Sequence, residues 1–214
     1  MDKVELNIWR LIKDSGKSSS FTPLELFILS CAAVSHDFDK GLFDKLPEGV
    51  EHGKGSGDLL IKQFREFQAS FPEMVVVKKI IGVHALSPEK FLQELSDIDR
   101  ETPLSTGPVR TRQLAVLLKA ADILHTDNSR IAHIGIDTSS MDEFDLSKHQ
   151  AREAISGWQV DGSRIIIQAI PETLDHLHAV EGCIEFIINK EWPAVADKLA
   201  DFNFPHKLDF RIDK

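Results

Sequence analysis

The chain has 214 residues, a formal net charge of −9 and 42% hydrophobic residues. This length fits one well-filled domain, or one domain with a small appendage, and the composition is typical of a soluble globular protein rather than a disordered one. No stretch approaches the roughly 18 unbroken apolar residues of a membrane span, and the N-terminus lacks the apolar core of a signal peptide. The acidic balance, without a long run of Lys or Arg, argues against membrane association and constitutive nucleic-acid binding.

The two cysteines, Cys31 and Cys183, both lie within apolar helical patterns. Such a pair predicts two buried thiols in a reducing compartment rather than a disulfide. We therefore expect a cytoplasmic protein.

Residues 3–14 predict a short amphipathic helix, which a polar connector separates from a second helix. The second helix has a strong start signal, with Thr22 as N-cap, Pro23 at the first position and Glu25 completing a capping box. Residues 24–34 are apolar almost all round, which predicts a central, buried helix.

The next segment contains glycines at alternating positions, so we expect no helix before Ser56, which could serve as an N-cap for a helix that runs to Phe67. Residues 72–86 contain a valine run that could form a strand, but their length favours a buried helix. Residues 96–110 are loop-like, as in a lid or an insertion. Residues 112–125 predict another apolar helix.

The pattern changes after Gly135, where strand-like runs flank an Asp161-Gly162 turn and predict a hairpin. One or two helices should follow over residues 172–202, and residues 206–213 alternate as a final strand. We therefore expect a mainly α protein with two parts. A helical domain should cover residues 1–155, and a small ββαβ-like α+β extension should cover residues 156–214 and pack on it.

Polar residues interrupt several of these apolar segments, and these residues carry the chemistry. They are His36, Asp37, His84 and Asp122, and a further histidine, His52, stands in the glycine-rich segment. Aspartate is almost never fully buried unless it is paired or binds a cation. Histidine and aspartate from separate helices form a site suited to Mn²⁺, Fe²⁺, Ni²⁺, Zn²⁺ or Mg²⁺.

Each of these residues also has a structural interpretation. His84 could be a hydrogen-bonded core residue, Asp122 could pair with Lys119 or Arg130, and residues 39–40 could be a solvated helix end. A metal site is favoured because the residues follow the order His-Asp, His, His, Asp across successive helices.

In this order the chain resembles the HD-domain superfamily of metal-dependent phosphohydrolases. The stretch "AAVSHDFDK" is similar to the "AALLHDIGK" segment of that family, and "EHGKGSGDLLI" to its "EHHKRSAELI". The stretch "KKIIGVHAL" resembles the helix that carries another histidine, and "LAVLLKAADILHTDNSRI" resembles "LARLLRLADALDxxxxRI". The likeness covers residues 24–131, and the tail resembles that of the branch with a C-terminal extension.

The resemblance implies a helical bundle of the HD type and a site for one or two divalent metal ions. It makes His36, Asp37 and Asp122 the primary ligands, while His52 and His84 complete or bridge a two-metal site. The implied activity is hydrolysis of a phosphomonoester or phosphodiester, often in a nucleotide, and a homo-oligomer is compatible with it. It also implies catalytic roles for Asp37 and Lys40, and contacts from Lys40 and Arg130 to the phosphorylated ligand.

The chain departs from the family pattern at the first ligand, because no histidine precedes His36. Glu5 or Asp2 could substitute as an oxygen ligand, the true start could lie upstream, or the site could have decayed.

Two further departures lie near the expected site. Asp39 stands where glycine is usual and adds negative charge, while Gly53 and Gly55 should loosen the segment that carries His52. These departures favour an alternative function, a catalytically impaired HD module that binds a nucleotide or a partner protein in a regulatory role.

Overall fold

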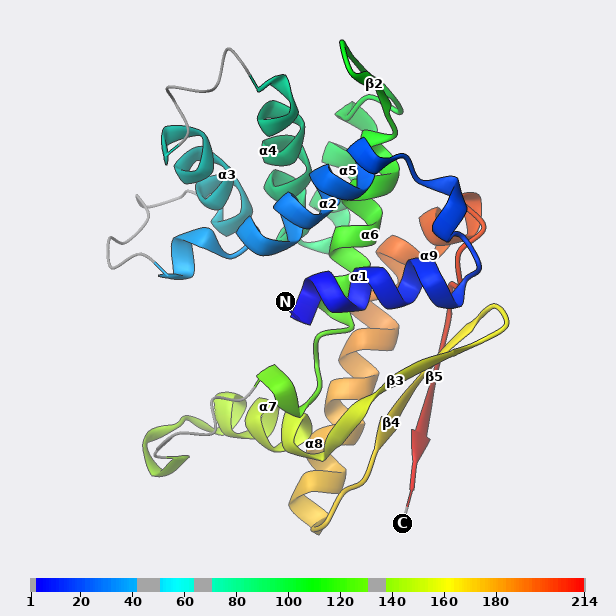
Figure 1. Cartoon of the computed structure of the whole chain (residues 1–214). Coiled ribbons are helices and arrows are strands. Elements are labelled where there is room, and N and C mark those ends of the chain that lie inside the picture. Colours follow the sequence, from blue (N-terminus) through cyan, green and yellow to red (C-terminus); the bar gives the residue numbers. More distant parts are fainter. Residues whose placement is uncertain (1–2, 42–50, 64–70, 131–137, 214) are drawn as a thin grey trace. The chain divides into compact units, whose positions relative to one another are not determined.

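The computed structural model describes residues 3–41, 51–63, 71–130 and 138–213. The chain packs as two compact units, Met1–Asp122 and Ile123–Lys214. The fold is mainly α with a small C-terminal sheet, as the sequence predicts (Figure 1). The expected division into a helical domain (residues 1–155) and a C-terminal extension (residues 156–214) stays a prediction. Among the described residues, no helix has both the length and the apolar character that a membrane span requires.

The first unit is helical and contains one short hairpin. Its main helices are α1 (Lys3–Asp14), α2 (Pro23–Ser35), α3 (His52–Gln63), α4 (Pro72–His84), α5 (Pro88–Asp97) and α6 (Thr111–Ile123). A short 3₁₀ turn, η2 (Phe38–Gly41), follows α2. In Figure 1, α3 and α4 lie side by side, and α2 also packs against α4.

The predicted start of α2 is confirmed. The Thr22 hydroxyl accepts a hydrogen bond from the Glu25 backbone N–H at 3.1 Å, and Glu25 accepts one from the Thr22 N–H at 3.0 Å. The helix buries one face, with Ile28, Leu29, Ala32 and Ala33 at most 1% exposed. The opposite face is not buried, because Phe27 and Val34 are 50% and 63% exposed.

The expectation that the glycines delay the start of α3 is wrong, since the helix begins at His52. A Cβ at Gly53 would lie 2.6 Å from the carbonyl oxygen of Ile81, and one at Gly57 would lie 3.0 Å from Cγ of Lys78. Both distances are too short for a comfortable contact. The glycines therefore allow α3 to approach α4 closely, and do not loosen the segment.

The segment expected to be a loop at 96–110 begins with the end of α5 and then forms a hairpin. Its strands are β1 (Thr102–Leu104) and β2 (Gly107–Val109), which pair antiparallel. Strands of three residues leave too little alternation for a sequence pattern to reveal. The Thr106 hydroxyl donates a hydrogen bond to Glu73 of α4 at 3.1 Å, which joins the hairpin to the bundle.

The second unit combines helices with a three-stranded sheet. Its elements are α7 (Glu143–Ala154), β3 (Ile155–Asp161), β4 (Arg164–Ala169), α8 (Leu174–Phe186), a π-helical turn (Ile187–Glu191), α9 (Pro193–Asp201) and β5 (Lys207–Ile212). The predicted hairpin is confirmed: β3 and β4 pair antiparallel around Gly162, whose φ is +60°. The predicted final strand, β5, pairs parallel with β4.

Candidate metal centre

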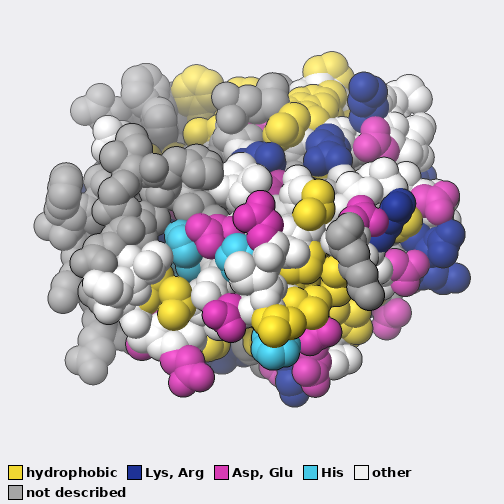
Figure 2. Space-filling view, turned by 90° about the horizontal axis from the view of Figure 1, so that it is seen from below, with side chains coloured by type: hydrophobic (Ala, Val, Ile, Leu, Met, Phe, Trp, Pro, Cys, Tyr) yellow, Lys and Arg dark blue, Asp and Glu magenta, His cyan; other side chains and the backbone are white. Residues whose placement is uncertain are grey.

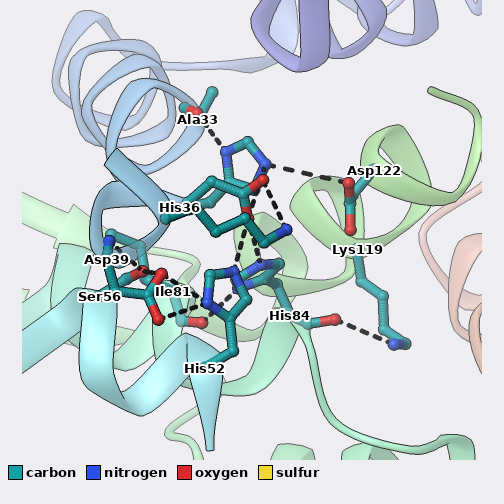
Figure 3. A network of polar contacts seen from close by, with 11 residues as sticks. Ala33, His36, Asp39, His52, Ser56, Ile81, His84, Lys119 and Asp122 are labelled. Atoms are coloured by element: carbon teal, nitrogen blue, oxygen red, sulfur yellow. Dashed lines mark hydrogen bonds and ion pairs between the residues drawn. The ribbon is translucent and has the colours of Figure 1, made fainter. Parts of the chain in front are cut away.

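Three helix ends in the first unit bring histidines together. His36 is the C-cap of α2, His84 is the last residue of α4, and His52 is the first residue of α3. The ring centroid of His84 lies 5.1 Å from that of His36 and 5.5 Å from that of His52. His36 and His84 are buried, and one ligand atom from each lies within 4.8 Å of an oxygen of Asp37. Figure 3 shows the histidine rings gathered between these helix ends.

One oxygen of Asp37 is the focus of this cluster. Its Oδ1 lies 2.6 Å from Nε2 of His52, 3.6 Å from Nε2 of His36 and 3.8 Å from Nε2 of His84. On α6, Asp122 places its Oδ1 3.9 Å from Nε2 of His36. The structure therefore brings together all five residues that the sequence predicted as ligands.

Each histidine presents the same ring nitrogen to the cluster. Nδ1 of His36 lies 2.6 Å from the Ala33 carbonyl oxygen, and Nδ1 of His84 lies 2.7 Å from that of Ile81. Nδ1 of His52 lies 2.5 Å from the Asp39 carboxylate. A carbonyl or carboxylate oxygen only accepts, so each Nδ1 carries the proton, and each Nε2 is the nitrogen directed at Asp37.

The carboxylate of Asp37 is held in its ionised form. Burial alone would raise its pKa, but hydrogen bonding with His52 and Lys40, together with the nearby rings of His84 and His36, outweighs burial and holds the pKa far below its usual range. The hydrogen bond to Asp37 also raises the pKa of His52, and the bond to Asp39 adds to this against the effect of burial. Both nitrogens of His52 face carboxylates, Nδ1 that of Asp39 and Nε2 that of Asp37. The cluster is thus a place that favours positive charge.

Lys40 stands at the open side of the cluster. Its Nζ donates a hydrogen bond to Oδ2 of Asp37 at 2.8 Å, and its side chain is 54% exposed. The side chain of Asp37 is itself 33% exposed. On the face drawn in Figure 2, histidine side chains come to the surface beside acidic ones. The cluster is therefore open to solvent at Asp37 and Lys40.

Three predicted contributors are not part of the described cluster. The side chain of Arg130 and all of Asp2 lie outside the described residues. Glu5 is described but does not belong to the His/Asp cluster found in that part of the chain. Its charge instead adds to the effect of burial in raising the pKa of the Cys31 thiol.

The residues that support the ligands were not predicted from the sequence. Asp39 is 8% exposed and bonded to His52, so it is not a solvated helix end. Lys119 is 3% exposed, and its Nζ donates hydrogen bonds to the carbonyl oxygens of His84 at 3.0 Å and Leu86 at 2.9 Å. A usable signal existed for Lys119: it lies three residues before Asp122, and residues at this spacing share a helix face.

The donor set fits a divalent cation. Three imidazole nitrogens in a single tautomer and two carboxylates are the nitrogen and oxygen ligands that Mn²⁺, Fe²⁺, Ni²⁺ and Zn²⁺ accept. Hydrogen bonds at the far nitrogen of each ring orient it, as protein metal sites require. The residues present therefore match the group that the resemblance implies.

Comparison with known proteins identifies the family of the chain. The family model HD-CE matches residues 1–200 of the chain. No curated protein and no solved structure matches the chain. Since the family model covers most of the sequence, the chain belongs to the HD-CE family, which is related to the HD domains.

Proposed function

We propose that this protein is a cytoplasmic, metal-dependent phosphohydrolase of the HD type that acts on a small phosphoester such as a nucleotide. The observation that carries the proposal is the common orientation of three histidines around Asp37, each with Nδ1 held by an acceptor and Nε2 facing the cluster. Two free cysteines accord with a reducing compartment.

His36, Asp37 and His84 would hold the cation, with Asp122 and His52 completing one or two sites. A divalent cation supplies Lewis acidity there: it lowers the pKa of water and neutralises charge that grows on phosphoryl oxygens. Because the net charge of the chain is −9, a bound cation would also provide the local positive charge that a phosphate needs.

The protein's own side chains would bind and orient the substrate. The half-exposed ammonium group of Lys40 lies 2.8 Å from Asp37, so it can bind a phosphoryl oxygen at the open side of the cluster. Lys40 contacts Oδ2 of Asp37, whereas His52 contacts Oδ1. The same carboxylate would therefore bind the cation and position the ammonium group that contacts the substrate. We also assign a substrate contact to Arg130, from the resemblance alone.

Metal analysis together with turnover tests the proposal. Protein purified without chelator should contain a divalent metal, and it should hydrolyse p-nitrophenyl phosphate, bis-p-nitrophenyl phosphate or a nucleotide from a panel. His36→Ala and Asp37→Ala should each lower kcat/KM by on the order of 10³-fold, or about 4 kcal/mol of transition-state stabilisation. His178→Ala, at an exposed histidine of α8, is the matched control and should retain activity. Absence of metal and of turnover in the wild-type protein would exclude the proposal.

The second candidate is a regulatory HD module that binds a nucleotide or a partner protein without turnover. The observation that favours it is the missing first histidine, and Glu5 is not grouped with His36, Asp37 and His84 in the described part of the chain. In this case calorimetry should detect nucleotide or partner binding that His36→Ala weakens, while no panel substrate is hydrolysed even with added Mn²⁺.

A further inference from the structure

His52 differs from the other two histidines in its place on the helix. The last carbonyl groups of a helix have no intrahelical partner. His36 and His84 stand at C-terminal ends and bond to carbonyl oxygens three residues earlier in their own helices. His52 opens α3, so no helical carbonyl precedes it. Its Nδ1 needs an acceptor from another part of the chain.

Asp39 is that acceptor. Its carboxylate lies 2.5 Å from Nδ1 of His52, and the residue is only 8% exposed. Ser56 fixes the carboxylate: its hydroxyl donates to Oδ1 of Asp39 at 2.7 Å and accepts from the Asp39 backbone N–H at 3.3 Å. Ser56 follows His52 by four residues and so faces the same side of α3, where both meet Asp39 (Figure 3).

We propose that Asp39, held by Ser56, is a positioning residue that orients His52 and keeps its proton on Nδ1, so that Nε2 serves the metal centre. The role of His52 at a metal centre rests on the proposed function, whereas the orientation of its ring by Asp39 can be measured without turnover. A carboxylate that accepts the Nδ1–H of a ligating histidine also makes Nε2 a more basic metal ligand than a carbonyl acceptor does. Asp39, where related motifs carry glycine, thus supports the ligand set and does not weaken it.

The test compares Asp39→Ala, Asp39→Asn and Ser56→Ala with Asp58→Ala. Asp58 is the matched control because it lies on α3, is 63% exposed and pairs with Lys78 outside the cluster. Two quantities are measured on each full-length variant: Zn²⁺ affinity by competition with a chelator, and the imidazole N–H resonances by ¹H–¹⁵N NMR. The His52 signal is assigned by its loss in His52→Gln, and thermal unfolding verifies that each variant folds.

Asp39→Ala should weaken Zn²⁺ binding 10- to about 100-fold, which is the usual effect of removing such a partner, and should abolish the low-field Nδ1–H resonance of His52. Asp39→Asn keeps an acceptor oxygen, so it should retain that resonance and lose less affinity. Ser56→Ala should have a smaller effect of the same kind, and Asp58→Ala none.

The inference is overturned if Asp39→Ala leaves both the Zn²⁺ affinity and the His52 resonance unchanged while the wild-type protein binds metal. If the wild-type protein binds no metal, the proposed function fails instead. The His52 resonance then decides alone whether Asp39 positions the ring. An Asp39→Ala protein that does not fold leaves the decision to Asp39→Asn and Ser56→Ala.

Discussion

Glu25 shows how one residue serves two purposes at a helix start. Its carboxylate completes the capping box of α2 and also accepts hydrogen bonds from Arg110, at 2.7 Å from Nε and 2.6 Å from Nη2. Glu25 is only 1% exposed, and burial alone would raise its pKa. The hydrogen bonds from Arg110 and Thr22 outweigh burial, so the pKa is lowered. The ionised form is therefore the one that stabilises the fold.

This predicts a pH dependence of stability that Glu25→Gln removes. A carboxyl group with a lowered pKa contributes stability above its unfolded-state pKa of about 4.3 and loses that contribution as the pH falls through its folded-state pKa. Urea unfolding should show Glu25→Gln less stable by about 1–3 kcal/mol at pH 7, and this difference should shrink below about pH 4. Glu89→Gln, at an exposed position of α5, is the control. A difference that does not change between pH 7 and pH 3 would contradict the argument.

At the scale of elements, the contact of α3 with α4 decides whether the histidines meet. Gly53 lies against the C-terminal end of α4, where a Cβ would come within 3.1 Å of Nδ1 of His84 as well as 2.6 Å from the Ile81 carbonyl oxygen. Only glycine allows this approach without a shift of the backbone. The same contact brings the ring of His52 to 5.5 Å from that of His84.

We expect Gly53→Ala to destabilise the protein. Steric overlap with backbone costs about 1–3 kcal/mol and exceeds the gain of about 1 kcal/mol from replacing a helical glycine. The control is Gly82→Ala on α4, where the nearest atom to an added Cβ is Cγ of Lys54 at 3.9 Å. Gly82→Ala should be neutral or slightly stabilising in urea unfolding. Equal stability of the two variants would mean that α3 and α4 tolerate a wider spacing.

At the scale of the molecule, the described members of the candidate metal centre all belong to the unit Met1–Asp122. The helix α6 carries Asp122 near its end, immediately before the unit Ile123–Lys214 begins. A metal ion that binds only the folded cluster should therefore stabilise the unit Met1–Asp122.

Metal binding is thus expected to stabilise the two units unequally. A ligand at 100 times its Kd adds about 2.7 kcal/mol to the stability of the state that binds it. Hydrogen exchange with saturating Zn²⁺ should slow in α2, α4 and α6 and stay unchanged in α8, and a chelator should reverse the effect. His36→Ala should abolish the change, and His178→Ala should preserve it. Equal slowing in α8 would contradict a site confined to the first unit.

Local patterns were enough to predict the helical character and several boundaries. The capping box at Thr22 and Glu25 and the Asp161-Gly162 hairpin follow from short-range geometry, and both are observed. The start of α3 was not predictable, because its glycines are unfavourable locally and are justified only by the proximity of α4. The hairpin after α5 was missed because its strands are too short to form a pattern.

The same distinction holds for the candidate site. The family resemblance and the five ligand candidates could be read from the sequence, because histidine and aspartate beside apolar segments need compensation wherever they fold. The contacts of Asp39, Ser56 and Lys119 could not, since each of these residues bonds to a residue of another element. A hydrogen bond depends on distance in space and not on separation along the chain. His52 and Asp39 are thirteen residues apart in the chain, and only the close packing of α3 brings them to 2.5 Å.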